Sequence, residues 1–220
     1  MHVLSAIIAA AVAATASATW GVDVSQATSP AAFSCLKKEG ARFASIRGFM
    51  ETDRPDPNGV HTVYNAWDGG MSDVDMYLFP APRGNAAAQA NSMLDYLTSY
   101  TISWTSGATP PHKIGMIWID VEAPDIWGSQ EANRAFLQEM VSTLQSRGVH
   151  VGIYTSESQW SPITGNAALF PSLPLWYAHY DNNPSFSDFA PFGGWSHPSI
   201  KQYEGSQSAC GAGVDKNYYP

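Results

Sequence analysis

The sequence predicts a single-domain α/β barrel. Short runs typical of strands recur along the chain, helical patterns separate the earlier runs, and one run, Met116–Ile119, is wholly apolar. Strands that alternate with helices form mostly parallel sheets, whose strands are buried on both faces. Eight such runs in 220 residues favour closure into one barrel of the TIM type.

The predicted strands are rich in β-branched and aromatic residues, and turn-forming residues separate them. They cover Gly21–Ser25, Phe43–Phe49, Asp75–Phe79, Gly115–Glu122, Val149–Tyr154, Leu175–Tyr180, Ser199–Tyr203 and Gly213–Asn217. Helices are expected between the first five of these runs, near Pro30–Glu39, Pro57–Asp68, Asn85–Tyr100 and Gln130–Arg147. After about residue 155 the helical signal fades into loops rich in Pro, Gly, Ser and aromatic residues.

The charge balance excludes one class of function. Eleven basic residues against 19 acidic ones give a formal net charge of −8. A protein that works by covering nucleic acid or an anionic membrane with a basic face carries the opposite balance. We therefore expect no nucleic-acid or membrane partner. Separately, we expect the chain to act as a monomer.

Residues 1–18 resemble a secretory signal peptide. Val3–Ala14 is almost wholly apolar but too short to span a bilayer, and Ala16-Ser17-Ala18 forms a small-x-small cleavage site. The alternatives are a short membrane anchor or a buried first helix. We expect the functional domain to cover residues 19–220, in the extracellular space or in the lumen of a secretory, digestive or lysosome-like compartment.

The two cysteines are expected to pair. Cys35 and Cys210 are far apart in sequence, and an oxidising compartment favours a disulfide over the alternative of two free thiols. In a closed barrel the first and last strands are neighbours, so a bridge between these positions is geometrically sensible. Neither cysteine has a metal-ligand neighbour, which argues against zinc.

The best catalytic candidates end the most apolar strand. Asp120 and Glu122 follow Ile117-Trp118-Ile119, and because strand side chains alternate, both point the same way, roughly 7 Å apart. Barrel enzymes place their active sites at the carboxyl ends of strands. Two carboxylates there suit acid-assisted glycoside cleavage, in which one stays protonated and the other ionised. The alternative is a solvated acidic loop.

Other acids are expected near the same mouth. Asp23 ends the first predicted strand and Asp215 lies in the last, whereas Asp75 begins its strand and fits less well. Closely spaced carboxylates raise the pKa of at least one member, which suits a general acid. The alternatives are separate capping and turn residues, or a divalent-cation site, which the scatter of the acids disfavours.

Aromatic residues supply candidate sugar contacts. Trp176, Tyr177 and Tyr180 cluster in Leu175–Tyr180, and Tyr203 follows nearby. Flat rings with polar rims suit the faces of sugars, although core packing explains many such rings equally well. We interpret His179 as a structural histidine that forms hydrogen bonds.

Five motifs together resemble those of glycoside hydrolase family 25, the CH-type lysozymes or N-acetylmuramidases. Their residues are most similar to those of the secreted eukaryotic branch of the family. The motifs are Gly-Val-Asp-Val-Ser-Gln at 21–26, Asp-Val-Glu at 120–122, Leu-Trp-Tyr-Ala-His-Tyr at 175–180, Ile-Lys-Gln-Tyr at 200–203 and Val-Asp-Lys-Asn at 214–217. The resemblance implies a modified barrel of five β/α units and three further strands, (β/α)5(β)3. It also implies cleavage, without metal or cofactor, of the β-1,4 bond between N-acetylmuramic acid and N-acetylglucosamine in bacterial peptidoglycan.

The resemblance also implies roles for single residues. Glu122 would be the general acid and Asp120 its acidic partner, with Asp23 and Asp215 as supporting acids. The residues expected to bind the saccharide are Tyr77, Trp176, Tyr180 and Gln202, and we add Asp75 as a further candidate. The chain departs from the family where Leu78 replaces a common His and Arg47 a common Lys.

Two other classes of function remain open from sequence alone. One is another acid-assisted glycosidase such as a chitinase, and the other is an inactive peptidoglycan-binding lectin. For the enzyme we expect activity best at acidic pH, because a chain at −8 gains no long-range attraction to an anionic wall. A digestive role fits that expectation better than an antibacterial one in open fluid.

Overall fold

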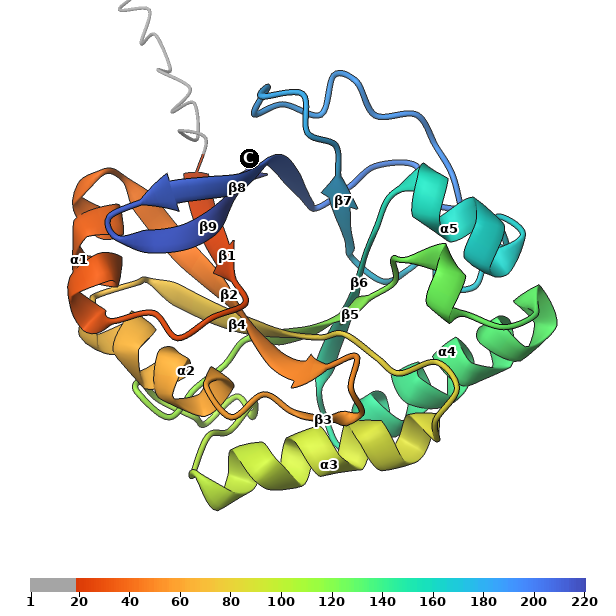
Figure 1. The fold of residues 1–220 in the computed structure, drawn as a ribbon, viewed down its shortest axis with the longest axis horizontal. Coiled ribbons are helices and arrows are strands. Elements are labelled where there is room, and N and C mark those ends of the chain that lie inside the picture. Colours follow the sequence, from red (N-terminus) through yellow and green to blue (C-terminus); the bar gives the residue numbers. More distant parts are fainter. Residues whose placement is uncertain (1–18) are drawn as a thin grey trace, which may run out of the picture.

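A computed structural model describes residues 19–220, so the expected signal segment lies outside the described residues. In this part of the chain eight strands close into one barrel, as the sequence predicts (Figure 1). Helices cover the left, lower and right sides of the ring in Figure 1, while loops cover its upper side. No helix of this part is both long and apolar enough to cross a bilayer.

The elements follow one another as five β/α units and three further strands, with a short strand, β3, added. The strands are β1 (Thr19–Val24), β2 (Ala41–Met50), β3 (Arg54–Pro55), β4 (Asp73–Leu78), β5 (Met116–Asp120), β6 (His150–Thr155), β7 (Leu175–Ala178), β8 (Ile200–Ala209) and β9 (Ala212–Tyr219). The helices are α1 (Pro30–Lys38), α2 (Gly59–Asp68), α3 (Ala86–Ser99), the 3-10 turn η1 (Pro124–Ile126), α4 (Gln130–Ser146) and α5 (Glu157–Thr164).

The order of strands explains how the barrel closes. From β1 through β2, β4, β5, β6 and β7 to β8, each strand runs parallel to its neighbour. Strand β9 runs antiparallel to both β8 and β1 and fills the last gap. Six strands therefore point their carboxyl ends in the same direction as β1, and β9 alone of the barrel strands points the other way.

The short helix α5 has no counterpart among the predicted helical segments. It has eight residues and carries Pro162 inside, so neither its length nor its periodicity makes a clear signal. Strand β3 pairs with the end of β2 through two residues only, which is too short for a sequence pattern to predict. The four predicted helices and eight predicted strands are all present, which confirms the expected fold class.

The apolar core has two compartments. The larger lies between the barrel wall and the helices, and it includes Leu78, which is fully buried there. The smaller fills the barrel itself and consists of Trp118, Tyr154, Trp176 and Ile200, which we call the interior cluster. Trp176 meets the rings of Trp118 and Tyr154 edge to face, with centroids 5.7 and 4.8 Å apart. A barrel of this size is packed and has no pore.

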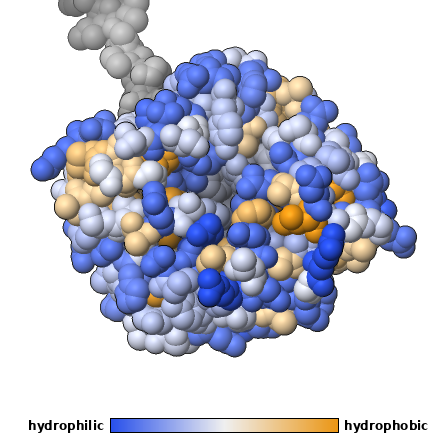
Figure 2. Space-filling view, in the orientation of Figure 1, coloured by the Kyte–Doolittle hydropathy of each residue, from blue (hydrophilic) through white to orange (hydrophobic). Residues whose placement is uncertain are grey.

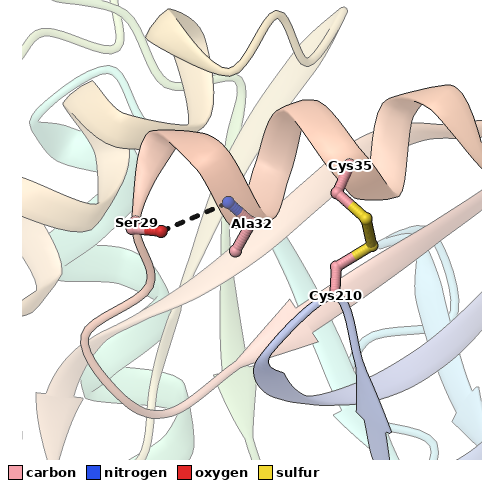
Figure 3. The surroundings of a disulfide bond; sticks show 4 residues. All are labelled: Ser29, Ala32, Cys35 and Cys210. Carbon is pink, nitrogen blue, oxygen red and sulfur yellow. Dashed lines mark hydrogen bonds between the residues drawn. A yellow bond between two sulfur atoms is a disulfide. The ribbon is translucent and has the colours of Figure 1, made fainter.

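The disulfide joins the first helix to the last hairpin, as expected (Figure 3). Ser29 caps α1 by accepting a hydrogen bond from the amide of Ala32, and Pro30 occupies the first turn. Cys35 then lies on the face of α1 that meets the β8–β9 turn, where Cys210 has a left-handed backbone. The two Cα atoms are 5.7 Å apart, across 175 residues of sequence.

Removal of this disulfide is expected to destabilise the fold strongly. Replacing both cysteines by serine should lower the free energy of unfolding by about 3–5 kcal/mol, because the bridge closes a very long loop in the unfolded chain. Urea denaturation of the double variant and of the wild type, each with and without a reductant, measures the effect. A reductant should weaken the wild type alone; a similar loss in the double variant would contradict the assignment.

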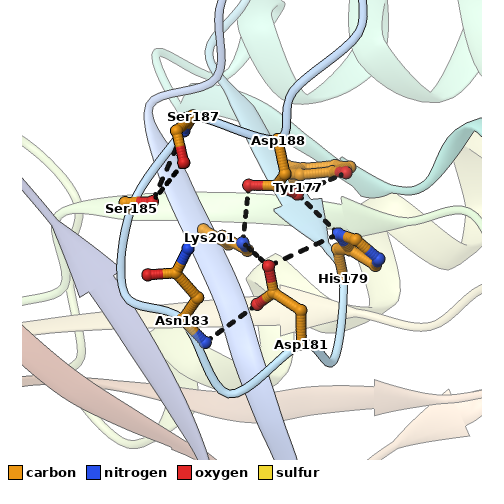
Figure 4. Close-up of polar contacts among 8 residues, drawn as sticks. All are labelled: Tyr177, His179, Asp181, Asn183, Ser185, Ser187, Asp188 and Lys201. Atoms are coloured by element: carbon orange, nitrogen blue, oxygen red, sulfur yellow. Dashed lines mark hydrogen bonds and ion pairs between the residues drawn. The ribbon is translucent and has the colours of Figure 1, made fainter.

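A buried lysine anchors the long β7–β8 connection, residues 179–199, against the barrel (Figure 4). Lys201 in β8 is 0% exposed, and its Nζ lies 2.8 Å from Asp181 Oδ2 and 2.7 Å from Asp188 Oδ1. His179 and Tyr177 also hydrogen bond to Asp188. Burial raises the pKa of Asp188, but the hydrogen bonds from Lys201 and His179 outweigh it and bring that pKa to about 2. The connection therefore takes the place that a helix occupies in the earlier units.

The Lys201 anchor is expected to contribute much more stability than an open ion pair. Lys201→Ala leaves two carboxylates without their positively charged partner and should lower the free energy of unfolding by about 3–5 kcal/mol. Lys216→Ala, which removes a half-buried lysine paired with Glu204, is the matched control and should cost less than about 1 kcal/mol. Urea denaturation at neutral pH measures both.

The same anchor has a predicted pH dependence. The pKa of Asp188 is lower in the folded protein than in the unfolded chain, where it is near 4. The ionised carboxylate therefore contributes fully to the stability of the fold above about pH 4, and this contribution is lost as pH falls toward 2. Equal losses of unfolding free energy in Lys201→Ala and Lys216→Ala would show that Lys201 does not anchor the connection.

Candidate active site

Four of the predicted acids meet at the carboxyl end of the barrel. Asp23 lies near the end of β1, Asp120 ends β5, Glu122 follows two residues later, and Asp215 lies in β9. Because β9 is antiparallel, its register places Asp215 directly opposite Asp23. The four acids share a pocket of about 100 Å³ with Tyr77, Tyr154, Trp176, Tyr180 and Gln202.

The chain around Glu122 is fixed by its own neighbours. Val121 is buried beneath the helices, and its carbonyl accepts a hydrogen bond from Thr155 Oγ1 at 2.7 Å. The carbonyl of Glu122 accepts one from the indole of Trp127 at 2.8 Å. Ala123 then turns the chain away in a left-handed conformation, with φ of 55°. Asp120 and Glu122 thus project together from an anchored strand end.

Asp120 is the most enclosed of the acids. It is 4% exposed, and its Oδ1 has no hydrogen-bond partner among residues 19–220. Burial raises its pKa well above the ordinary value, and the charges of Glu122 and Asp23 raise it further. A carboxyl oxygen that is buried without a partner is costly unless a ligand completes it.

Asp23 is held by two side-chain amides. Nδ2 of Asn217 and Nε2 of Gln202 both donate to Asp23 Oδ2, at 2.7 and 2.8 Å. Burial and the charge of Asp215 nevertheless raise the pKa of Asp23 to about 8. Trp176 donates to Asn217 Oδ1 at 2.7 Å, so the interior cluster fixes which way that amide points.

Gln202 lines the acid pocket, and its role as a saccharide contact stays a prediction. It is 2% exposed, and both ends of its amide are used within the protein. Tyr154 and Tyr180 donate to its Oε1 at 2.6 and 2.8 Å, which directs its Nε2 to Asp23 and Asp215. Gln202 therefore positions the acids from below.

Glu122 and Asp215 are more open than the other two acids. Burial raises the pKa of Glu122, and the charge of Asp215 adds to the shift. Burial also raises the pKa of Asp215, against a hydrogen bond from the amide of Ser206. The positive charge of Arg47 opposes the shift of Asp120, and its guanidinium is itself fixed by Asp56 at 2.8 Å and the carbonyl of Ser25 at 2.7 Å.

Asp75 does not join this group, which corrects the expectation of five acids around one mouth. It lies at the amino end of its parallel strand, β4, and so faces the opposite end of the barrel. Its carboxylate accepts hydrogen bonds from the amide of Met116 and the indole of Trp118.

The aromatic candidates divide by depth. Tyr180 is 58% exposed at the mouth, whereas Trp176 is 2% exposed and belongs to the interior cluster below. Tyr77 packs edge to face on Trp176 and lines the pocket. Two pocket-shaping residues were absent from the predicted set: Tyr154 and Asn217. Asn217 lies two residues after Asp215, so strand alternation alone points it to the same face.

A wider depression continues from the acids along the last hairpin. It encloses about 420 Å³, shares Asp23, Tyr77 and Asp215 with the acid pocket, and is otherwise lined largely by hydroxyl and amide side chains, namely Ser25, Gln26, Ser206, Gln207 and Ser208. The face in Figure 2 is mostly hydrophilic, with a recess near its centre. Neutral donors and acceptors beside carboxylates suit a hydroxyl-rich ligand.

Candidate metal ligands lie elsewhere in the described part of the chain. One set comprises the disulfide cysteines and Glu39, and the other comprises His179, Asp181 and Asp188. In the second set the ammonium of Lys201 already supplies the positive charge between the two carboxylates.

Comparison with known proteins agrees with this geometry. Residues 14–203 match the family model described as lysozyme-like protein 1. The chain is 49% identical over 205 residues to "Probable GH family 25 lysozyme 2" of Dictyostelium discoideum, covering 93% of this chain and 92% of that protein. It is 45% identical to "Probable GH family 25 lysozyme 4" of the same organism, over 91% and 90%.

The fold matches as well. The muramidase structure from Acremonium alcalophilum superposes with a TM-score of 0.74 at 24% identity, covering 92% of this chain and 93% of that one. This match shows that the two chains share a fold. The chain belongs to glycoside hydrolase family 25 and is a lysozyme-type glycoside hydrolase.

Proposed function

We propose that this lysozyme hydrolyses the β-1,4 bond between N-acetylmuramic acid and N-acetylglucosamine in bacterial peptidoglycan, with Glu122 as general acid and Asp120 as its partner. The observation that carries the proposal is the pair itself: two carboxyl groups from one strand end, both with raised pKa, in an acid pocket that adjoins the hydroxyl- and amide-lined depression. Glycosidic cleavage needs one protonated and one ionised carboxyl group at the scissile bond.

The two carboxyl groups differ in what they can reach. Glu122 lies beyond the end of β5 and is more open, so it can give its proton to the leaving oxygen. Asp120 is enclosed, and its partnerless Oδ1 is suited to accept the N–H of the sugar's acetamido group or to stabilise positive charge at the anomeric carbon. Asp215, when ionised, adds negative potential around the developing oxocarbenium ion. Asp23, whose pKa is about 8, is neutral at the acidic pH proposed here.

Substrate binding would also arrange the protons. Asp120 and Glu122 titrate together, because an ionised Glu122 raises the pKa of Asp120. A donor from the substrate at Asp120 Oδ1 favours the ionised form of Asp120, which leaves the proton of the pair on Glu122. The enclosed carboxyl then becomes the charge stabiliser and the open one the acid.

The two alternatives from other classes differ in products. A chitinase would act on chitin and leave peptidoglycan intact, and a lectin would bind the wall without cleaving it. The retained Asp120–Glu122 pair and the names of the relatives support the muramidase. We also propose secretion, from the signal-like residues 1–18, and a digestive role at acidic pH in preference to an antibacterial one.

Loss of the acid proton is expected to abolish turnover. Glu122→Gln keeps the size of the side chain but cannot donate a proton, and it should lower kcat by about 10²–10⁴-fold. Release of reducing muramic-acid ends from purified peptidoglycan measures it, with chitin as a parallel substrate. Glu139→Gln, an exposed position on α4, is the control and should retain wild-type activity. Wall binding without release by the wild type would identify a lectin.

The pH profile is expected to depend on Asp215. A general acid works while protonated, so activity should fall as pH rises through the raised pKa of Glu122. Asp215→Asn removes a negative charge that supports this shift and keeps an oxygen for the Ser206 amide. Its alkaline limb should move to lower pH, whereas Asp95→Asn, on the outer helix α3, should leave the limb in place. An optimum near pH 8 in the wild type would refute the acidic assignment.

A further inference from the structure

A second cavity opens at the end of the barrel opposite the acids. It encloses about 510 Å³ and is lined by residues at the amino ends of the parallel strands, among them Phe43 of β2, Asp75 of β4, Met116 of β5 and Ile200 of β8. This volume falls in the range of small-molecule sites in proteins, about 300–1,000 Å³. The cavity shares no lining residue with the acid pocket.

The inner wall of this cavity is apolar and aromatic. Trp118 and Ile200 are members of the interior cluster, and Phe43 and Met116 pack against it. The cavity therefore ends on rings and aliphatic groups, which suit the flat apolar body of a ligand.

One carboxylate interrupts this apolar wall. Asp75 Oδ1 accepts from the amide of Met116 at 2.8 Å, and Oδ2 accepts from the indole of Trp118 at 2.9 Å. Each oxygen of a carboxylate has a second lone pair, so both can accept another donor. The mechanism proposed above makes no use of this acid.

The charges around the cavity favour a cation. Asp73 lies at the exposed rim beside Asp75, and Arg42 is the one basic residue among the groups that line the cavity. Burial, followed by the charge of Asp73, raises the pKa of Asp75 to about 6 against its two hydrogen bonds. No Lys or Arg of residues 19–220 lies within ion-pair distance of Asp75, so its charge is compensated by hydrogen bonds alone.

We propose that this cavity is a second binding site, for a small organic cation: an ammonium group beside Asp75 carried on a flat apolar body that lies against Phe43 and Met116. The ammonium supplies the charge and donors that Asp75 lacks, in a setting where hydrogen bonds between charged groups are strong. A ring against Phe43 and Met116, which are only partly buried, adds apolar contact. An anion meets two acids, and a neutral compound leaves Asp75 uncompensated.

Benzylamine is a suitable probe, and benzyl alcohol is its neutral match. Isothermal titration calorimetry of the full chain at pH 7.5 should show saturable, one-site binding of benzylamine and binding of benzyl alcohol at least about tenfold weaker. Asp75→Asn keeps the shape of the side chain and should remove the preference for the amine. Asp95→Asn, an exposed acid on α3, should change neither affinity.

A second pair of variants covers the case in which Asp75→Asn folds poorly. Arg42→Gln removes the cation at the exposed rim and should tighten benzylamine binding several-fold, while Asp73→Asn should weaken it by a similar factor. Both positions are exposed, so folding should be preserved. Because Asp75 must be ionised to pair, wild-type affinity for benzylamine should also fall by more than about tenfold between pH 7.5 and pH 4.5.

Three results would overturn the proposal. They are the absence of saturable benzylamine binding in the wild type, equal affinity for the alcohol and the amine, and an affinity that the charge variants at positions 42, 73 and 75 leave unchanged. The assay contains no glycan, so its outcome is independent of whether the proposed muramidase activity is found.

Discussion

The antiparallel closure of the barrel by β9 is the constraint on which the active site depends. In a wholly parallel barrel the last strand would bring its own carboxyl end to the mouth, and Asp215 would have to lie at the end of that strand. Here β9 turns back from β8, and the middle of the strand places Asp215 opposite Asp23. The bridge from Cys35 to Cys210 holds the hairpin turn to α1. The pairing of β9 that closes the barrel therefore also assembles the acid group.

Burying four carboxyl groups together is unfavourable, and the interior of the barrel is built to offset that cost. The amides of Asn217 and Gln202 donate to Asp23, and an indole and two phenols fix the direction of those amides. The aromatic side chains thus fill the barrel and also orient the amides of the polar layer above them. Because every donor below Asp23 is already committed, the remaining acceptor capacity of the acids faces the mouth, where a substrate arrives.

The sequence predicted the fold and four of the site acids because both follow from local rules. Strand alternation sets Asp120 and Glu122 on one face, and the parallel arrangement sets Asp23 at the same end. Asp75 was misplaced because a strand's acid faces the mouth only near its carboxyl end, and Asp75 lies in the amino-terminal half of β4. The depth of Gln202 could not be predicted because depth within a barrel is set by tertiary packing around Tyr154 and Tyr180, which no periodicity reveals. The helix α5 was missed because Pro162 breaks its pattern.

The assignment of acid and stabiliser rests finally on an asymmetry of access. Asp120 is 4% exposed and Glu122 is more open, and burial disfavours a charged carboxylate, so in the empty site the proton of the pair favours Asp120. That arrangement is unproductive, because an enclosed group reaches the leaving oxygen poorly. Its partnerless Oδ1 is the feature that allows the arrangement to reverse. In the proposed mechanism, a substrate that donates there would draw negative charge to Asp120 and leave the proton on Glu122, so a correctly seated sugar would create the active protonation state.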